Sequence, residues 1–169
     1  MSNDPVRHAL RVELSLDVQV RPATEFDAAA VRALAGELVA GAAPWRPVAG
    51  VTAAAAAWVS DACRTGTDAE HTLLVAGDGD GALLGFAGVS VRRHFSGDRD
   101  AYLGELVVTP DARRRGVGSR LVRAAEEWAA GHGLDRLTLE TGAANTPARR
   151  LYARLGYLEE EVTLTRVLG

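Results

Sequence analysis

Residues 113–119, which read RRRGVGS, constrain the fold more than any other segment of the chain. The strand-like run 101–108 precedes them, and after Ser119 apolar residues recur on one helical face as far as Gly131. This order of strand, loop and helix leaves the amides of the first helical turn unpaired, at the positive end of the helix. The pattern therefore predicts a phosphate site. For an isolated Gly-x-Gly pair, a solvated arginine turn is the alternative.

Two other phosphate motifs do not fit this loop. A nucleotide-triphosphate loop requires lysine after its second glycine, and the chain contains no lysine. A dinucleotide-binding fingerprint requires a third glycine where Leu121 stands, and it opens an early strand-helix-strand unit rather than a late one. The absence of lysine also excludes a lysine nucleophile and a Schiff base.

Size and composition indicate one folded domain. The chain has 169 residues, of which 47% are hydrophobic and 24% charged, and we place the domain at 16–169. Residues 1–15 show no sustained period, so we expect an N-terminal extension that is either partly disordered or ordered by packing. A net charge of -3 argues against nucleic acid as a partner. No membrane span or targeting segment is recognisable, which predicts no membrane partner and a cytoplasmic location.

Periodicity and turn residues divide the chain into strands and helices, and their order predicts an α/β fold with a mixed sheet covered by helices. Thr24 and Asp27 are expected to cap the first helix, and the loop 41–50 carries Trp45. The predicted strands are 16–21, 72–76, 82–91, 101–108, 136–140 and 160–167; the predicted helices are 25–39, 52–63, 119–130 and a short one that Thr146-Pro147 opens and Gly156 closes.

Two features that suggest other chemistry have structural explanations. Residues 77–81 read GDGDG between two strands, which favours a hairpin turn over a calcium loop because further acidic ligands do not follow. The single cysteine, Cys63, lies in an alanine-rich helical stretch, which favours a buried side chain over a nucleophile. No metal site is therefore predicted.

The phosphate loop resembles that of the GNAT superfamily of acyl-CoA-dependent N-acetyltransferases. The family's loop reads Arg/Gln-x-x-Gly-x-Gly/Ala, which Arg113, Gly116 and Gly118 match. The resemblance implies acetyl-CoA as co-substrate, with its pyrophosphate on the loop and its pantetheine arm along the preceding strand. It also implies a mostly antiparallel central sheet of six to seven strands flanked by about four helices.

A second motif of the same family follows in the right order. The likeness runs from about Val18 to Leu164, and the second motif consists of Asn145, Ala148, Leu151-Tyr152 and Gly156-Tyr157. By resemblance, the coenzyme-binding residues are Leu106, Val107, Val108, Arg113, Arg114, Arg115, Gly116, Val117, Gly118, Ser119, Asn145 and Tyr152.

The resemblance also implies catalytic roles. Tyr152 is the expected general acid for the leaving thiolate, and the amide of Val107 is the expected oxyanion donor. Glu105 is the candidate base, acting through water on an ammonium with a pKa near 10.4, and a role in merely attracting that ammonium is the alternative. The reserve candidates for the base are His94, Asp98, Asp100 and Glu140.

The expected function is acetyl transfer from acetyl-CoA to a primary amine by direct attack in a ternary complex. Two alternatives remain at this stage. One is a non-catalytic acyl-CoA-binding regulatory module, and the other is an acetyltransferase acting on protein N-termini or lysines. The acceptor is thus a small-molecule or peptide amine. The alternating segment 160–167 leaves pairing with another subunit, and hence a homodimer, open.

Overall fold

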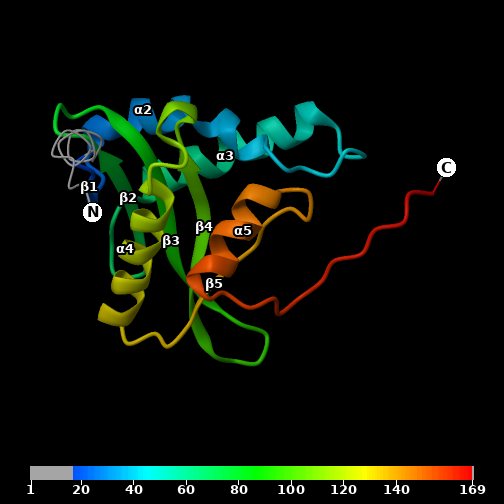
Figure 1. The fold of residues 1–169 in the computed structure, drawn as a ribbon. Coiled ribbons are helices and arrows are strands. Elements are labelled where there is room, and N and C mark those ends of the chain that lie inside the picture. Colours follow the sequence, from blue (N-terminus) through cyan, green and yellow to red (C-terminus); the bar gives the residue numbers. More distant parts are fainter. Residues whose placement is uncertain (1–16, 169) are drawn as a thin grey trace, which may run out of the picture.

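The computed structural model describes residues 17–168, and a mixed sheet with helices on both faces dominates it (Figure 1). The predicted N-terminal extension, residues 1–15, lies outside the described part. The strands are β1 (Gln19–Pro22), β2 (His71–Gly77), β3 (Leu83–Arg93), β4 (Arg99–Val108) and β5 (Leu137–Leu139). The helices are α2 (Ala28–Ala33), α3 (Val48–Thr65), α4 (Val117–Gly131) and α5 (Thr146–Leu155), with 3-10 turns η1 (Glu25–Asp27), η2 (Ala35–Val39) and η3 (Pro110–Ala112).

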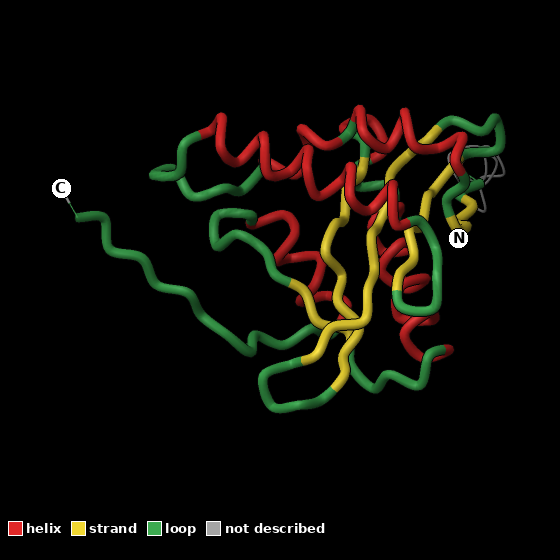
Figure 2. The backbone as a smooth tube through the Cα atoms, turned by 180° about the vertical axis from the view of Figure 1, so that it is seen from behind, coloured by secondary structure: helices red, strands yellow, loops and turns green. Residues whose placement is uncertain are grey.

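The strands form one sheet in the order β1-β2-β3-β4-β5. The first four are antiparallel, and β5 runs parallel to β4. The α/β class, the mostly antiparallel sheet and the four α-helices are as predicted. The prediction of six to seven strands is wrong, because residues 17–168 form five. The predicted closing strand, 160–167, has no strand partner there, and this tail runs away from the body (Figures 1 and 2).

Each face of the sheet has its own hydrophobic core. Helices α2 and α3 cover one face, where Val31 and Val59 pack with Phe86 and Val107. Helix α4 covers the other face, and α5 packs against its margin through Tyr152 and Leu155. The main buried side chains of this second core are Ala87, Val89, Leu103, Val117, Leu121, Val122 and Ala125. No helix in the described part is long and apolar enough to cross a membrane.

Several predicted helix boundaries differ from the structure. The expected helix 25–39 is broken at Leu34 into α2 and the 3-10 turn η2, where Gly36 weakens helix formation. The expected helix 52–63 is longer, because Pro47 opens it at Val48. The N-cap of α5 is Asn145 rather than Thr146, since its side-chain oxygen accepts from the Ala148 amide at 3.3 Å.

A β-bulge in β4 turns one predicted site residue to the other face of the sheet. Glu105 pairs with Gly88 and Leu103 with Val89, so Gly104 is an extra residue. In an unbroken strand Glu105 would share the α4 face with Leu103. The bulge instead places it on the face of Val107, toward α2 and α3.

Candidate active site

The loop between β4 and α4 turns its free amides outward. Arg114 is the one non-glycine residue of the described part with positive φ, at 62°, and Gly116 follows at 85°. The first amide of α4 that donates to a backbone carbonyl is that of Arg120, and its acceptor is the carbonyl of Gly116 in the loop. The amides of 114–119 donate to no backbone carbonyl within residues 17–168. Left-handed residues beside a helix start are typical of an anion-binding concavity.

Gly118 lets three elements meet behind this loop. A Cβ atom at Gly118 would lie 3.3 Å from Cδ2 of Leu151 in α5 and 3.6 Å from Cγ2 of Val108 in β4. The start of α4, the end of β4 and α5 therefore converge at one point. A larger side chain at Gly118 would push them apart.

The edge of β4 that faces β5 is open along half its length. The pairing with β5 ends at Leu103, so residues 104–108 have only β3 as a partner strand in the described part. The Thr109 amide donates to Leu84, and because antiparallel pairs alternate, the amide of Val107 also points to β3. The amides at the open edge are those of Leu106 and Val108. Val107 thus does not present the free amide expected of an oxyanion donor.

Arg113 belongs to the framework of the site. Its Nε donates to the carbonyl of Val108 at 3.2 Å, and its guanidinium pairs with the carboxylate of Glu37 in η2. The side chains of Arg114 and Arg115 are exposed at the mouth of the loop. Two of the three arginines are therefore available to an incoming polyanion.

Asn145 joins the second motif to the loop that follows η2. A Cβ atom at Gly41 would overlap the side chain of Asn145, and one at Gly142 would overlap the carbonyl oxygen of Gly41. The two segments touch backbone to backbone at these glycines. Trp45 lies in the same loop and is about half exposed. The loop 40–47 thus forms a wall beside the N-terminus of α5.

Tyr152 lies on the α4 face of the sheet and is largely buried. Burial raises the pKa of its phenol to about 12, so the group is protonated at neutral pH. Its ring lies 5.6 Å from that of Tyr157, with the planes inclined at 57°. The Tyr157 hydroxyl donates to Oε1 of Glu126 at 3.0 Å, so Tyr157 is tied to α4. This contact fixes the ring on which Tyr152 packs.

Glu105 lies on the opposite face, below α3. Burial, and to a smaller degree the charge of Asp61, raise the pKa of its carboxyl to about 7. Gly88 in β3 is the residue paired with Glu105, and a Cβ atom at Gly88 would overlap Oε2 of Glu105. Glycine at position 88 is thus what leaves room for the carboxylate. The two predicted catalytic groups flank the open edge of β4 from opposite faces.

The reserve candidates lie around the far end of β4 and are engaged in pairs. Nδ1 of His94 bonds Oγ of Ser96 at 2.8 Å. Arg136 bridges Asp98 at 3.1 Å and the buried Asp100 at 2.8 Å. Glu140 accepts from Arg92 at 3.0 Å. These contacts give each of them a structural role.

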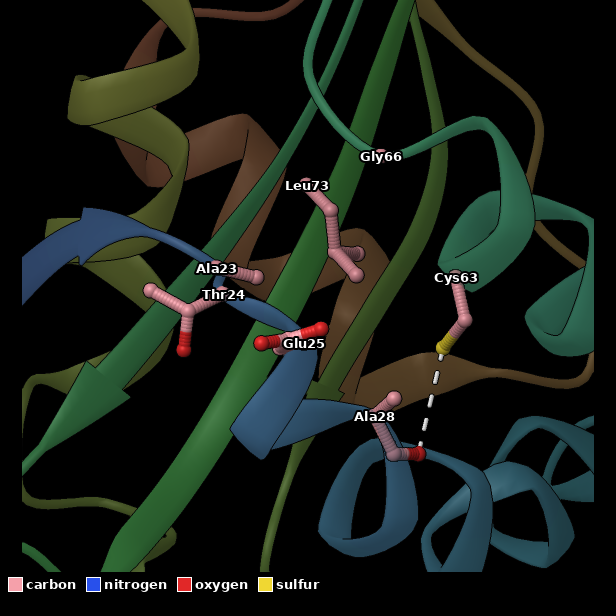
Figure 3. Close-up of a pocket in the computed structure, with 7 residues that line it drawn as sticks. All are labelled: Ala23, Thr24, Glu25, Ala28, Cys63, Gly66 and Leu73. Atoms are coloured by element: carbon pink, nitrogen blue, oxygen red, sulfur yellow. Dashed lines mark hydrogen bonds between the residues drawn. The ribbon is translucent and has the colours of Figure 1, made fainter.

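A separate pocket of about 220 Å³ lies between the start of η1, the end of α3 and β2. None of the predicted site residues lines it. Cys63 does, and its Sγ points to the carbonyl oxygen of Ala28 at 4.0 Å (Figure 3). Burial raises the pKa of the Cys63 thiol, which disfavours the reactive thiolate. Cys63 is partly rather than fully buried, so the expected buried position is met only in part.

The sequence reasoning missed the residues that shape the site. Gly88 leaves space for the carboxylate of Glu105, and the bulge at Gly104 sets the face on which Glu105 lies. Glu37 forms an ion pair with Arg113, and Glu126 accepts a hydrogen bond from Tyr157. A glycine inside a strand is a known signal of a bulge or a close approach, and Gly88 and Gly104 both carried it. The partners of Arg113 and Tyr157 are 76 and 31 residues away, and no local pattern marks such pairs.

The fold is a mixed α/β sheet with an open strand edge beside a helix start rich in free amides, an arrangement suited to a ligand that carries phosphate. The model of the acetyltransferase (GNAT) family matches residues 42–157. The chain therefore belongs to the GNAT family of acyl-CoA-dependent acetyltransferases.

The relatives agree with this assignment. An aminoglycoside N(6')-acetyltransferase type 1 from Klebsiella aerogenes is 34% identical over 137 residues, which are 68% of this chain and 88% of the relative. A putative acetyl transferase from Pyrococcus furiosus superposes with a TM-score of 0.72 at 20% identity, over 90% of this chain and all of that one. The structure of AAC(6')-Iy with a CoA bisubstrate analogue has a TM-score of 0.67 at 23% identity, over 90% and 99% of the two chains.

Proposed function

We propose that the chain transfers the acetyl group of acetyl-CoA to a primary amine of a small molecule, by direct attack in a ternary complex. One observation carries the proposal: the open edge of β4 begins beside the free amides of residues 114–119 and has Glu105 on one face and Tyr152 on the other. Those amides can donate hydrogen bonds to the diphosphate oxygens of the coenzyme, and the exposed Arg114 and Arg115 can attract its negative charge. The amides of Leu106 and Val108 are free to hold the pantetheine arm.

The environment of Glu105 supports its role as the base. An ordinary glutamate has a pKa near 4.3, about 6 units below the pKa near 10.4 of an alkylammonium. Proton transfer from that ammonium to an ordinary glutamate would therefore cost about 8 kcal/mol. The raised pKa of about 7 narrows that gap to about 3.4 units, or about 5 kcal/mol. At neutral pH about half of the Glu105 carboxyl is still deprotonated, and this form can accept the ammonium proton through water.

Tyr152 acts from the other face as the proton donor. When bound, acetyl-CoA supplies a thioester whose sulfur leaves as a thiolate. A phenol with a pKa of about 12 is about 3.5 units above a thiol near 8.5, so full transfer costs about 5 kcal/mol. The same burial raises the pKa of the sulfur, which reduces this cost. Tyr152 thus donates as charge develops on sulfur.

The relatives favour a small, polyamine-like acceptor. The Klebsiella relative is named for an aminoglycoside, and a streptothricin acetyltransferase of Streptomyces lavendulae is 35% identical over 92 residues, which are 54% of this chain and 47% of the relative. The carboxylates of Glu105 and Asp61 suit a polycation, and the loop 40–47 with Trp45 provides a wall.

The test is a thiol-release screen of the purified protein with acetyl-CoA and a panel of aminoglycosides, other small amines and peptides. Amine-dependent release of free thiol, with acetylated small amines identified by mass spectrometry, is expected. Release with peptides alone would reassign the acceptor to proteins. Coenzyme binding without any amine-dependent release would make the chain a regulatory module.

A further inference from the structure

The side chain of Arg113 lies across the end of the open edge of β4. A strand residue directs its amide and its carbonyl to the same edge, so the carbonyl of Val108 points away from β3, as its amide does. Nε of Arg113 donates to that carbonyl at 3.2 Å. Arg113 therefore satisfies the last outward acceptor of the strand, beside the free amide of Val108.

The same guanidinium also reaches one of the two helical layers. Its Nη2 pairs with the carboxylate of Glu37 in η2. The turn η2 belongs to the layer of α2 and α3, because its residue Ala35 is buried in the same core as Val107. One planar group thus makes both contacts, through different nitrogens. The Glu37–Arg113 pair ties the loop between β4 and α4 to the layer that covers the Glu105 face.

That loop has few contacts of its own to hold its shape. The amides of residues 114–119 donate to no backbone carbonyl in the described part of the chain, and Arg114 adopts a left-handed conformation that residues with a side chain rarely adopt. Among residues 113–119, Arg113 is the one whose side chain makes hydrogen bonds within residues 17–168. Its two contacts therefore anchor the loop immediately before the free amides.

Glu37 places a negative charge beside a site proposed for a polyanion. Its side chain is 34% exposed and that of Arg113 is 47% exposed, so solvent screens the pair only in part. If charge alone mattered, removing the carboxylate would leave the guanidinium free for the diphosphate and would tighten CoA binding. If Glu37 instead holds the loop in its binding conformation, removing the carboxylate weakens CoA binding although the site becomes more positive. The two roles predict changes of opposite sign.

We propose that Glu37 is a positioning residue for the coenzyme: through Arg113 it holds the amides of residues 114–119 in the arrangement that binds the diphosphate. Glu37 precedes residues 42–157, which the family model matches, so this support comes from a part of the chain outside that match. The proposal rests on the proposed binding of acetyl-CoA at this loop. It adds that the affinity depends on an acidic residue 76 positions away in the chain.

Calorimetry of CoA binding to the native protein and to Glu37→Gln tests the proposal. We expect Glu37→Gln to raise Kd about fivefold, in keeping with the modest strength of a half-exposed ion pair. The KM for acetyl-CoA should rise by the same factor, with kcat within about twofold of the native value. A loss of folding stability alone would not change the Kd of the folded protein. An equal or lower Kd in Glu37→Gln would overturn the proposal.

Glu70→Gln is the matched control for the lost charge. Glu70 forms an exposed ion pair with Arg99, which lies at the opposite end of β4 from the loop. The control therefore removes one carboxylate and one ion pair without touching the anchor of the loop, and its Kd for CoA should equal that of the native protein. A similar rise of Kd in both variants would mean that the effect does not come from the contact with Arg113.

Arg113→Lys keeps the proposal testable if Glu37→Gln does not fold. Lysine retains the charge but lacks the planar guanidinium that joins Val108 to Glu37, so this variant should also raise Kd about fivefold. Either change alone breaks the connection, so Kd of the double variant should stay about fivefold above the native value instead of rising about 25-fold. Losses that multiply in the double variant would contradict a joint action of the two residues.

The native protein separates this inference from the proposed function. No binding of CoA by the native chain would overturn the proposed function, and the role of Glu37 with it. Equally tight binding by the native chain and by Glu37→Gln would leave the proposed function standing and overturn the role of Glu37 alone.

Discussion

Glu105 shows how one buried carboxyl connects the fold with the proposed chemistry. Its pKa of about 7 arises first from burial, and Gly88 and the bulge at Gly104 create that buried position. A base acts in its deprotonated form, so activity should rise with pH as this group ionises.

The first prediction is the pH profile of kcat/KM for acetyl transfer. The native protein should show an acidic limb with an apparent pKa near 7, set by Glu105. Glu105→Gln should remove that limb and lower kcat by roughly 100-fold or more, the usual contribution of a general base. A limb that persists in the glutamine variant would mean that another group titrates there. A near-normal kcat with a raised KM would assign Glu105 to binding the ammonium.

The same carboxyl makes a prediction for stability. Its folded-state pKa of about 7 lies above the ordinary value of 4.5, so the folded state binds the proton more tightly. The stabilisation is complete below pH 4.5 and is lost as the pH rises through 7. A glutamine stays neutral, so Glu105→Gln should gain on the native protein by up to about 3 kcal/mol between pH 4.5 and pH 8. Urea unfolding at both pH values measures this difference. A constant difference would contradict the raised pKa.

Tyr152 and Tyr157 form a matched pair for testing the acid. Tyr152→Phe should lower turnover while coenzyme affinity, measured by calorimetry, stays nearly constant. Tyr157→Phe removes the hydroxyl that donates a hydrogen bond to Glu126, and this change should instead cost about 1 kcal/mol of folding stability. Unchanged turnover in the Tyr152 variant would remove its role as proton donor.

At the scale of elements, glycines decide where the chain bends and where elements approach. Gly156 ends α5 with φ of 93°, as local sequence rules predict, and Gly116 precedes α4 with φ of 85°. Gly104 acts differently, because its bulge depends on how β4 registers against β3. A simple period of two therefore assigns Glu105 to the wrong face. The class of fold and both motifs were readable from the letters, whereas this orientation required the partner strand.

The same limit explains the strand count. The alternation in 160–167 predicted a closing strand, but a strand also needs an edge to pair with, and residues 160–167 have none in the described part. Whether that edge lies within the chain depends on how α5 and the contacts of Glu159 direct the tail, and those contacts join residues across elements. Pattern alone could not supply this information.

The close contacts of Gly118 with α5 and β4 give a testable prediction about how these elements position the loop. Gly118→Val should force α4 away from Leu151 and Val108 and weaken coenzyme binding at least tenfold, because the free amides of the loop shift with the helix. Gly131→Ala at the other end of α4 is the control, since nothing lies within 4 Å of its Cβ position. Calorimetry of both variants with CoA measures the effect. Equal CoA affinities in the two variants would mean that the start of α4 does not contribute to the binding site.

Across the whole molecule, the open edge of β4 lies between the two helical layers, with Glu105 toward α2 and α3 and Tyr152 toward α4 and α5. A ligand in that edge would contact both layers and stabilise the folded state by mass action. At a concentration of 100 times its Kd, CoA should add about 2.7 kcal/mol, or about 5–10 °C in Tm.

Pantetheine, which lacks the diphosphate, separates the contributions of the loop and the strand in a thermal shift measurement. If the amides of residues 114–119 provide most of the affinity, pantetheine at the same concentration should shift Tm by less than a quarter as much as CoA. Raised salt should reduce the CoA shift further, because Arg114 and Arg115 are exposed and their attraction is screened. Equal shifts by the two ligands would instead locate the affinity in the strand edge and leave the arginine loop without a role in binding.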